Sequence, residues 1–190
     1  MRYGELRVVC GPMFSGKTEC LVREVVFRTQ CRGEAVRVFR PGFDARAGGA
    51  VLLTHDGVSV PAEVLRHAGQ IAATEAALIV LDEIQFLEQP MFDGDIAAAI
   101  RAARGRGIDV WCAGLDMDFR GRAFDVSAAL MAESSEIVRR TARCARCGAP
   151  ATHTARTREQ ADRFAIGGAD AYAPMCRAHW WRDRRQDDVA

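Results

Sequence analysis

The sequence predicts an α/β protein, in which a parallel sheet carries helices on its faces and a small metal-binding module follows toward the C-terminus. Two observations predict this architecture. Short apolar runs at Leu6–Cys10, Ala76–Leu81 and Ile108–Ala113 alternate with segments whose apolar residues recur at helical spacing. From about Arg140 this alternation stops, and two close pairs of metal-ligand residue types appear instead.

The composition indicates a soluble globular protein with one core domain and a short appendage. The chain has 190 residues, of which 49% are hydrophobic and 27% are charged, and its formal net charge is +1. A nearly neutral chain has no global field that would draw it onto nucleic acid or a membrane. No apolar run reaches the ~20 residues of a membrane helix, and the first residues lack a secretory signal pattern. The seven cysteines, an odd number, favour a reducing compartment, so we expect a cytoplasmic protein.

The first elements are a strand, a loop and a helix. Leu6–Cys10 is β-branched and ends in a glycine-rich turn, and apolar residues then recur at helical spacing over Lys17–Thr29. Ala35–Phe39 alternates apolar and polar residues, which predicts a second strand. Pro41 and Gly42 end that strand, because neither residue continues regular structure easily.

A long loop is predicted for Asp44–Val60, which is rich in glycine and polar residues. Within it, Val51–Leu53 can form a short strand, followed by a turn at Asp56-Gly57. Loops of this length are usually functional or mobile. The apolar run Ala76–Leu81 then predicts a strand buried on both faces, with Asp82-Glu83 at its carboxyl end.

The next helix is predicted over Asp93–Arg104, and Gly105 and Gly107 end it. Ile108–Ala113 follows as another buried strand, which leaves the sheet at Gly114. Ligands of parallel sheets bind outside the carboxyl ends of the strands. We therefore expect the chemistry of this protein where these strands end.

Residues 11–18 have the sequence pattern of a phosphate-binding loop, with the strand before it and the helix after it that this pattern requires. Its glycines let backbone N–H groups turn toward phosphate oxygens, Lys17 adds a cation, and the Thr18 hydroxyl can bind Mg²⁺. A glycine-rich turn with a chance lysine is the alternative, which the context disfavours. The fold is therefore predicted to be of the RecA-like P-loop kind, and the expected nucleotide contacts here are Gly11, Pro12, Met13, Phe14, Ser15, Gly16, Lys17 and Thr18.

The acidic pair Asp82-Glu83 predicts the second half of a nucleotide site. Asp82 would bind Mg²⁺ directly or through water, and Glu83 could accept the proton of a hydroxyl that attacks the γ-phosphate of ATP. Acidic residues after a strand are also common as simple helix caps. The phosphate loop upstream favours the catalytic interpretation.

Cys144-x-x-Cys147 and Cys176-x-x-His179 have the spacing of a closed tetrahedral zinc site in a module resembling a zinc ribbon. Three thiolates and one imidazole leave no open coordination position, so the metal would be structural. Unrelated thiols with a chance histidine are the alternative. The arginines that precede and enter this module could contact nucleic acid, but a solvated basic face is the simpler interpretation of Arg139, Arg140, Arg143 and Arg146.

From Gly11 to His179 the sequence resembles the thymidine kinases of the small tetrameric class found in animals and many bacteria. The motifs that carry this resemblance are Gly-Pro-Met-Phe-Ser-Gly-Lys-Thr at 11–18, Phe39-Arg40-Pro41 with Asp44-x-Arg46, Thr54-His55-Asp56, Asp82-Glu83-Ile84-Gln85-Phe86, Gly114-Leu115-Asp116 and Gly167-Gly168-Ala169-Asp170-x-Tyr172.

The resemblance implies specific roles for residues at matching positions. Glu83 would be the catalytic base, Lys17 and Arg46 would act on the phosphates, and Asp44 and Gln85 would lie in the nucleotide site. A loop of the zinc module would close over the nucleoside base. The base pocket implied by position consists of Met13, Phe86, Leu115, Phe119, Phe124, Thr154, Ile166, Gly167, Gly168 and Tyr172. Ile84 and Arg40 depart from the residues usual in the family, as do Arg163 and Ala165 in the closing loop.

We therefore expect a thymidine kinase that makes dTMP from deoxythymidine and ATP, with Mg²⁺ and a structural Zn²⁺. The expected domains are a nucleotide-binding domain at 1–138, a zinc domain with the closing loop at 139–182 and a loose charged tail at 183–190. The resemblance further implies a homotetramer and allows feedback by dTTP. The competing hypotheses are an ATPase stimulated by nucleic acid, with Glu83 activating water, and a non-catalytic nucleotide sensor. Balanced charge and the absence of an aromatic stacking platform disfavour the ATPase, and the complete acidic pair disfavours the sensor.

Overall fold

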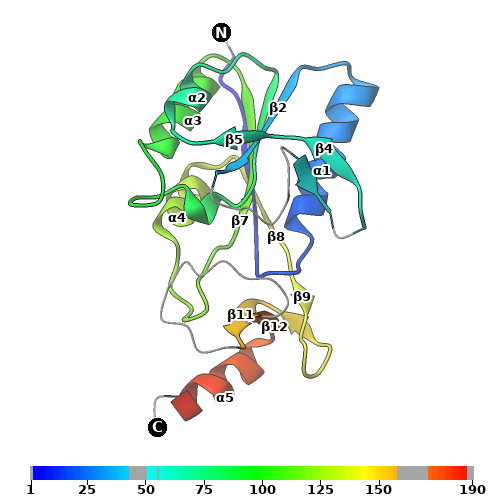
Figure 1. Ribbon diagram of the computed structural model, residues 1–190, viewed down its shortest axis with the longest axis vertical. Coiled ribbons are helices and arrows are strands. Elements are labelled where there is room, and N and C mark those ends of the chain that lie inside the picture. Colours follow the sequence, from blue (N-terminus) through cyan, green and yellow to red (C-terminus); the bar gives the residue numbers. More distant parts are fainter. Residues whose placement is uncertain (1, 43–50, 55, 158–170, 188–190) are drawn as a thin grey trace.

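The structure, a computed structural model, describes residues 2–42, 51–54, 56–157 and 171–187. Its main element is a six-stranded sheet in which all neighbouring strands are parallel (Figure 1). From one edge to the other, the strands are β5 (Glu63–Leu65), β2 (Val36–Pro41), β6 (Leu78–Leu81), β7 (Asp109–Gly114), β1 (Leu6–Cys10) and β8 (Glu136–Arg139). The predicted α/β class, a parallel sheet with flanking helices, is confirmed.

Helices cover both faces of the sheet. Helix α1 (Lys17–Val26) lies on one face together with the hairpin of β3 (Val51–Leu53) and β4 (Ser59–Pro61), where Leu21 and Leu52 join one apolar cluster. The opposite face carries α2 (Gly69–Ala72), α3 (Ile96–Gly105) and α4 (Asp125–Glu133) (Figure 1). The fold is therefore a three-layer sandwich with one apolar cluster on each side of the sheet.

Strand order places the predicted chemistry at one edge of the sheet. Strand β7 lies between β1, which leads into the phosphate loop, and β6, which leads into Asp82-Glu83. The register pairs Cys10 with Gly114 and Leu81 with Cys112, so the three strands end at nearly the same level. Their carboxyl ends therefore meet, as expected for a ligand site of a parallel sheet.

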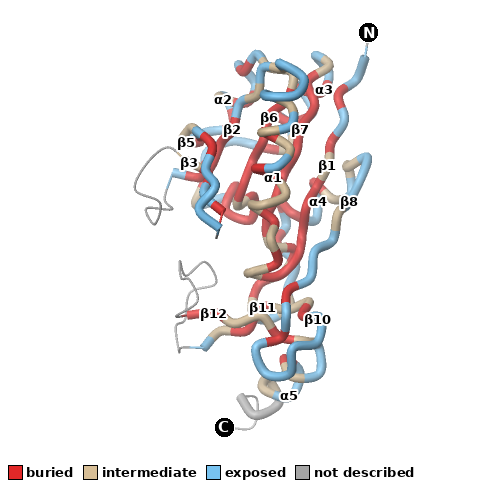
Figure 2. Tube along the Cα trace, turned by 90° about the vertical axis from the view of Figure 1, so that its right-hand side faces the viewer, coloured by how far each residue is buried: buried red, intermediate tan, exposed pale blue. Residues whose placement is uncertain are grey.

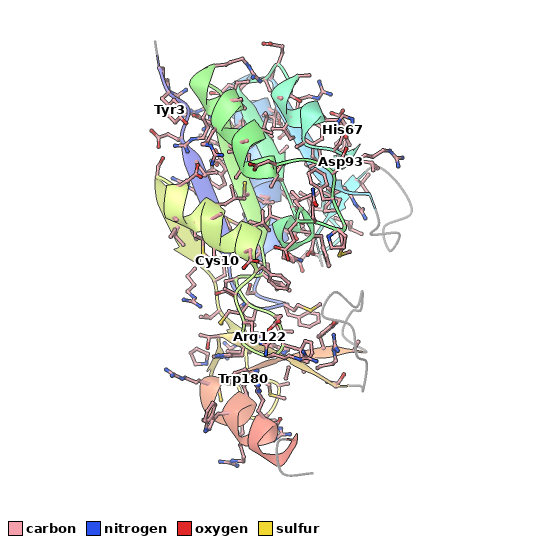
Figure 3. All side chains as sticks on the ribbon, turned by 90° about the vertical axis from the view of Figure 1, so that its left-hand side faces the viewer. Tyr3, Cys10, His67, Asp93, Arg122 and Trp180 are labelled. Carbon is pink, nitrogen blue, oxygen red and sulfur yellow. The ribbon has the colours of Figure 1, made fainter. Side chains whose placement is uncertain are left out.

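The C-terminal module has its own small apolar cluster. It consists of β9 (Ala142–Arg143), β10 (Pro150–Ala151), β11 (His153–Arg156), β12 (Tyr172–Met175) and α5 (Arg177–Asp187), with two antiparallel hairpins. Figure 2 shows this second group of buried residues below the sheet. Trp180, labelled in Figure 3, is its largest member. Its ring stacks on His153 with 4.3 Å between centroids, and its Nε1 donates to the Phe119 carbonyl at 3.0 Å. The module thereby packs against the loop that precedes α4.

The structure differs from several predicted boundaries. α3 begins at Ile96 rather than near Asp93, because the Asp95 side chain accepts from Ala98 N at 2.9 Å and caps the helix there. α1 ends at Val26, and the chain continues as a π-helix, η1 (Phe27–Cys31). A 3₁₀ turn, η2 (Ile84–Phe86), follows the acidic pair.

The last described helix extends beyond the boundary expected for the zinc domain. α5 continues to Asp187, into the segment from 183 for which the sequence predicts a loose tail. An ion pair between Arg146 and Asp183 at 2.8 Å and the packing of Arg184 over Trp180 tie this helix to the module. Among the helices of the described residues, none is both long and apolar enough to span a membrane.

Candidate active site

The phosphate loop connects β1 to α1 and adopts backbone conformations that require glycine at two positions. Gly11 has φ 142° and Gly16 has φ 75°. A Cβ on Gly11 would lie 2.3 Å from the Arg140 carbonyl oxygen, so only glycine fits there. The Ser15 hydroxyl oxygen is buried, belongs to a residue that lines the cavity, and has no hydrogen-bond partner among the described residues. A buried hydroxyl without a partner is costly, and a phosphate oxygen at the loop would satisfy it.

Lys17 lies at the start of α1 and is buried. Its Nζ donates to the Pro12 carbonyl within the loop at 2.7 Å. Burial lowers the pKa of Lys17, and the carboxylates of Glu83, Asp82 and, more weakly, Asp116 act in the opposite direction. A carbonyl thus holds the ammonium group at the loop, and the nearby carboxylates favour its charged form.

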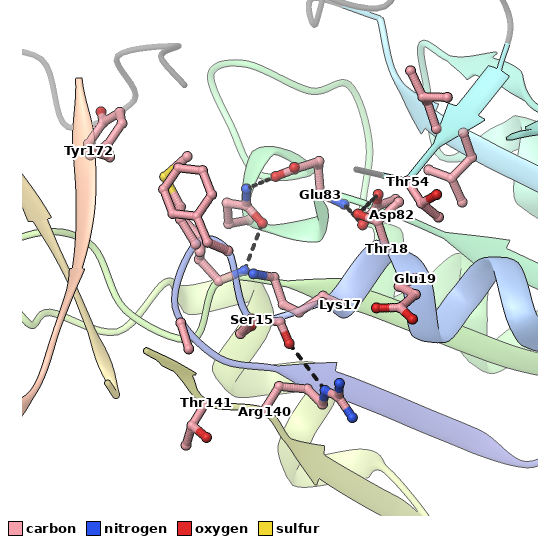
Figure 4. Close-up of a pocket in the computed structure, with 18 of the residues that line it drawn as sticks. Ser15, Lys17, Thr18, Glu19, Thr54, Asp82, Glu83, Arg140, Thr141 and Tyr172 are labelled. Atoms are coloured by element: carbon pink, nitrogen blue, oxygen red, sulfur yellow. Dashed lines mark hydrogen bonds between the residues drawn. The ribbon is translucent and has the colours of Figure 1, made fainter. Parts of the chain in front are cut away.

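Asp82 is buried and contacts Thr18 directly. Its Oδ2 accepts from Thr18 Oγ1 at 2.9 Å, and its Oδ1 accepts from the backbone N–H of Glu83 at 2.9 Å (Figure 4). Burial, together with repulsion from the Glu83 carboxylate, raises the pKa of Asp82 to about 7. A hydroxyl and a carboxylate this close are the oxygen ligands that Mg²⁺ prefers beside nucleotide phosphates, so the residues present fit this ion.

The Glu83 side chain is positioned by Gln85. Glu83 has a left-handed backbone, φ 54° and ψ 42°, and its carboxylate accepts from Gln85 Nε2. Gln85 is 1% exposed, and its Oε1 accepts from Leu115 N at 3.0 Å. A Cβ on Gly114 would lie 2.6 Å from Gln85 Oε1, so glycine at the end of β7 makes room for this amide. Gln85 therefore links the loops after β6 and β7 and holds Glu83 between them.

These groups share one cavity of about 930 Å³. The phosphate loop, the acidic pair, the β3 hairpin and the C-terminal module all contribute to its wall (Figure 4). Of the residues predicted for the base pocket, those that line the cavity are Met13, Phe86, Leu115 and Tyr172. The cavity is also lined by most of the residues predicted to bind the nucleotide: Met13, Phe14, Ser15, Gly16, Lys17, Thr18, Asp82, Glu83 and Gln85.

Other predicted pocket residues lie behind the cavity wall. Thr154 is buried and its Oγ1 accepts from Met13 N at 3.0 Å, so it supports the loop from the module. Phe119 lies under the Arg156 guanidinium, whose Cζ is 3.7 Å from the ring centroid, and Phe124 is buried just before α4. Gly11 and Pro12 are buried at the start of the loop. Five further predicted site residues lie outside the described part of the chain: Asp44, Arg46, Ile166, Gly167 and Gly168.

Sequence reasoning missed several residues of the cavity wall. Arg40, Glu19 and Thr54 line it, and so do Arg140 and Arg143, which the sequence assigns to a solvated face. The place of Arg140 could not be predicted because β8, the strand before it, was not recognised. Its residues, Glu136–Arg139, are largely exposed and have no apolar pattern that predicts a strand. A strand beside β1 would have placed the residue after it at the phosphate loop.

The Cys/His cluster has the geometry of a closed metal site. One ligand atom from each of Cys144, Cys147, Cys176 and His179 lies within 4.8 Å of all the others. The Sγ atoms of Cys147 and Cys176 are 3.9 Å apart, close to the ~3.8 Å expected for two thiolates on one tetrahedral Zn²⁺. Backbone amides, first that of Cys176, lower the pKa of the Cys144 thiol to about 5. A thiolate is the form that binds metal, so these residues fit a structural Zn²⁺.

The chain is similar to solved structures and matches a protein-family model. A crystal structure of a DNA replication initiation factor is similar over 72% of this chain, with 13% identity and a TM-score of 0.41, and the chain spans 40% of that protein's length. The flagellar accessory protein FlaH from Methanocaldococcus jannaschii is similar over 85% of this chain and 76% of its own, with 10% identity and a TM-score of 0.46. Neither similarity bears on function. The model of the family described as thymidine kinase matches residues 4–180.

Proposed function

The chain belongs to the thymidine kinase family, and from this premise we propose that it transfers the γ-phosphoryl group of ATP to the 5′-hydroxyl of deoxythymidine. The products would be dTMP and ADP. One observation carries the proposal: the Glu83 carboxylate and the phosphate loop face the same cavity, so a base and a phosphoryl donor can meet there. Phosphoryl transfer requires mainly positioning and charge neutralisation, which this arrangement offers.

On the donor side, the loop amides and Lys17 would bind the phosphates of ATP. Lys17 is already in place at the loop, held by Pro12 at 2.7 Å. Thr18 and Asp82 would hold the Mg²⁺ that accompanies ATP and neutralises phosphate charge. Asp44 and Arg46 lie outside the described residues, and their roles near the phosphates remain predictions of the family resemblance.

On the acceptor side, Glu83 would take the proton of the 5′-hydroxyl as its oxygen attacks the γ-phosphorus. The bond between the γ-phosphorus and the bridging oxygen then breaks, and ADP leaves with that oxygen. Gln85 fixes the carboxylate through its Nε2, and its anchor on Leu115 N prevents the amide from turning away. Gln85 is thus a positioning residue, and its contribution to nucleotide binding would be through Glu83.

The nucleoside base would lie among Met13, Phe86, Leu115 and Tyr172, which supply apolar and aromatic surface from four separate segments. Such surfaces sandwich a planar base, while a few polar groups fix its orientation. Thr154 would keep Met13 in place through its backbone N–H. Phe119 and Phe124 would support this wall from behind, and the closing loop at Ile166, Gly167 and Gly168 remains a prediction.

The zinc module would serve as a structural support of the acceptor pocket. It provides Tyr172 to the wall and packs its apolar cluster against Phe14 of the phosphate loop. We also propose a cytoplasmic location, because none of the seven cysteines forms a disulfide and three of them belong to the Cys/His cluster. A homotetramer and feedback by dTTP are further proposals that rest on the family resemblance.

The test is direct. The purified protein is incubated with ATP, Mg²⁺ and a panel of ribo- and deoxynucleosides, and new monophosphates are separated by chromatography. We expect dTMP and equimolar ADP, with little product from purine nucleosides. Phosphate release that needs no nucleoside and increases with added DNA or RNA would instead support a nucleic-acid-stimulated ATPase and overturn the proposal.

A further inference from the structure

The four arginines around the start of the C-terminal module occupy different environments. Arg139 pairs with the buried Asp116 at 2.6 Å, and Arg146 pairs with Asp183 at 2.8 Å. Arg140 and Arg143 line the cavity instead, and neither pairs with a carboxylate among the residues that the structure describes. All four side chains are exposed, as expected for a solvated basic face, but two of them also border the cavity.

Arg140 is fixed to the phosphate loop at both its backbone and its side chain. It follows β8 directly, and its N–H donates to the Cys10 carbonyl at 2.7 Å, so the parallel pairing of β8 with β1 brings it beside the loop. Its Nε donates to the Ser15 carbonyl at 3.2 Å (Figure 4). Its Nη2 lies 3.3 Å from the position that a Cβ on Gly16 would occupy. The guanidinium is thus held over the glycine that precedes Lys17.

The charges around the phosphate loop do not by themselves neutralise a bound triphosphate, so a further cation would contribute to binding. The Lys17 ammonium group already faces the carboxylates of Asp82 and Glu83, so part of its charge is compensated before any nucleotide binds. Glu19 also faces Gly16, but its ion pair is with Arg23 at 2.6 Å. A nucleoside triphosphate brings about four negative charges, of which one Mg²⁺ offsets two. An uncompensated guanidinium at the loop would neutralise much of the remainder.

Building on the proposed use of the loop for ATP, we propose that Arg140 is a second phosphate-binding cation of this site. Its Nε is used by Ser15, and the remaining N–H groups of its planar fork are available for phosphate oxygens on the α1 side of the loop. Lys17 approaches the same phosphates from the other side, where Asp82 and Glu83 lie. The two cations would therefore bind different oxygens and would not replace each other.

The test compares two substitutions that remove the same charge from the same wall. Arg140→Gln and Arg143→Gln are titrated with MgATP by calorimetry, without nucleoside. Charge-assisted hydrogen bonds at a partly exposed site correspond to about tenfold in affinity, so we expect Arg140→Gln to weaken MgATP binding about tenfold. Arg143, which has no bond to the loop, should change it less than about twofold. Arg140→Lys should be intermediate, because it keeps the charge but loses the bond to Ser15.

Steady-state kinetics give a second reading: Arg140→Gln should raise KM for ATP and leave KM for thymidine nearly unchanged. Thermal unfolding and zinc content, measured on each variant, show whether a loss of MgATP affinity is caused by misfolding. If Arg140→Gln is misfolded, the MgATP affinity of Arg140→Lys decides the test. Wild-type affinity in Arg140→Gln, or an equal loss in Arg143→Gln, would overturn the inference. If the wild type binds MgATP and Arg140→Gln is weakened but no nucleoside is phosphorylated, the inference stands and the proposed function fails. A wild type that binds neither ATP nor ADP would overturn both.

Discussion

At the scale of single residues, backbone strain is concentrated at the site. Among the described non-glycine residues, positive φ occurs at Phe14, 63°, and at Glu83, 54°. Such conformations cost about 1–3 kcal/mol each and persist where surrounding contacts enforce them. For Phe14 those contacts come from the apolar cluster of the zinc module, and for Glu83 from Asp82 and Gln85. The strain orients the loop and the proposed base toward the same cavity.

Glu83→Gln should leave the binding of MgATP within about twofold of wild type, because the loop and Lys17 remain. Turnover should fall about 10²–10⁴-fold, since an amide cannot accept the proton of the 5′-hydroxyl. Single-turnover kinetics and an ATP titration of the same preparation check this. Near-normal turnover would remove Glu83 from its role as base.

Gln85→Glu should change the pH dependence of turnover. The new carboxylate can still accept from Leu115 N, but it replaces the amide donor with a second negative charge beside Glu83, and two adjacent carboxylates do not both ionise easily. Because the base acts only when ionised, the acidic limb of the kcat profile should move to higher pH, with the largest loss at low pH. Gln70→Glu is the control, because Gln70 is an amide with similar backbone bonds at Arg66 and Val64, away from the cavity. If the pH profile of kcat for Gln85→Glu has the same acidic limb as that of the wild type, Gln85 does not position Glu83.

At the scale of elements, a network of ion pairs stabilises the end of the sheet that lies opposite the cavity. Asp109, at the start of β7, accepts from Glu5 N and pairs with Arg2 and Arg28. Arg28, in η1, also pairs with Glu24 and Glu34. Burial raises the pKa of Asp109, but these donors outweigh burial and lower it below its ordinary value. The network therefore joins the N-terminus, α1 with η1, and β7.

Asp109→Asn should lower the free energy of unfolding by about 2 kcal/mol at pH 7, because hydrogen bonds to a buried charge are lost. Since the pKa of Asp109 is lowered by folding, its charge stabilises the protein above about pH 4, and this contribution disappears as pH falls through the folded-state pKa. Urea unfolding should thus show a clear difference in the free energy of unfolding between wild type and Asp109→Asn at pH 7, and a much smaller difference near pH 3.

Asp95→Asn is the matched control for this experiment. Asp95 is exposed, its distance to Arg101 is 4.0 Å, and asparagine caps α3 as well as aspartate does. A change within about 0.5 kcal/mol is expected. Equal effects of the two substitutions would show that the network around Asp109 contributes nothing of its own.

At the scale of the whole molecule, the zinc module and the sheet domain share the phosphate loop. Phe14 packs on the module's apolar cluster, Met13 N donates to Thr154, and Trp180 donates to Phe119. These contacts come from segments at both ends of the chain. The module therefore supports the phosphate loop as well as the proposed base pocket, although none of the four Cys/His residues lines the cavity.

Cys147→Ser should remove zinc and destabilise the module, because metal binding supplies the folding energy of so small a unit. We expect zinc to fall from about one equivalent per chain to none, and the thermal midpoint to fall by about 5–10 °C. Cys31→Ser is the control, since Cys31 is an exposed thiol outside the cluster, and it should change neither quantity. Zinc-free wild-type protein with full stability would contradict a structural metal.

Residues close together in the chain allowed the most reliable predictions. The phosphate loop, the acidic pair after β6, and the two Cys/His pairs each lie within a few residues, so their spacing alone indicates their chemistry. The central strands β1, β6 and β7 were predicted because their residues are mostly apolar. The edge strands β5 and β8 were not, because short strands at a sheet edge are partly exposed and have no such pattern.

By itself, the sequence determined that this protein has the pattern of a phosphate loop, an acidic strand end and a Cys/His cluster suited to a metal, because local spacing is sufficient to specify each of them. Only the tertiary structure decided which distant groups complete the site. Gln85 meets Leu115 because β6 and β7 are neighbours, and Arg140 meets Ser15 because β8 lies beside β1. Strand order depends on the packing of the whole sheet, and a contact across it between residues far apart in the chain leaves no local pattern to read.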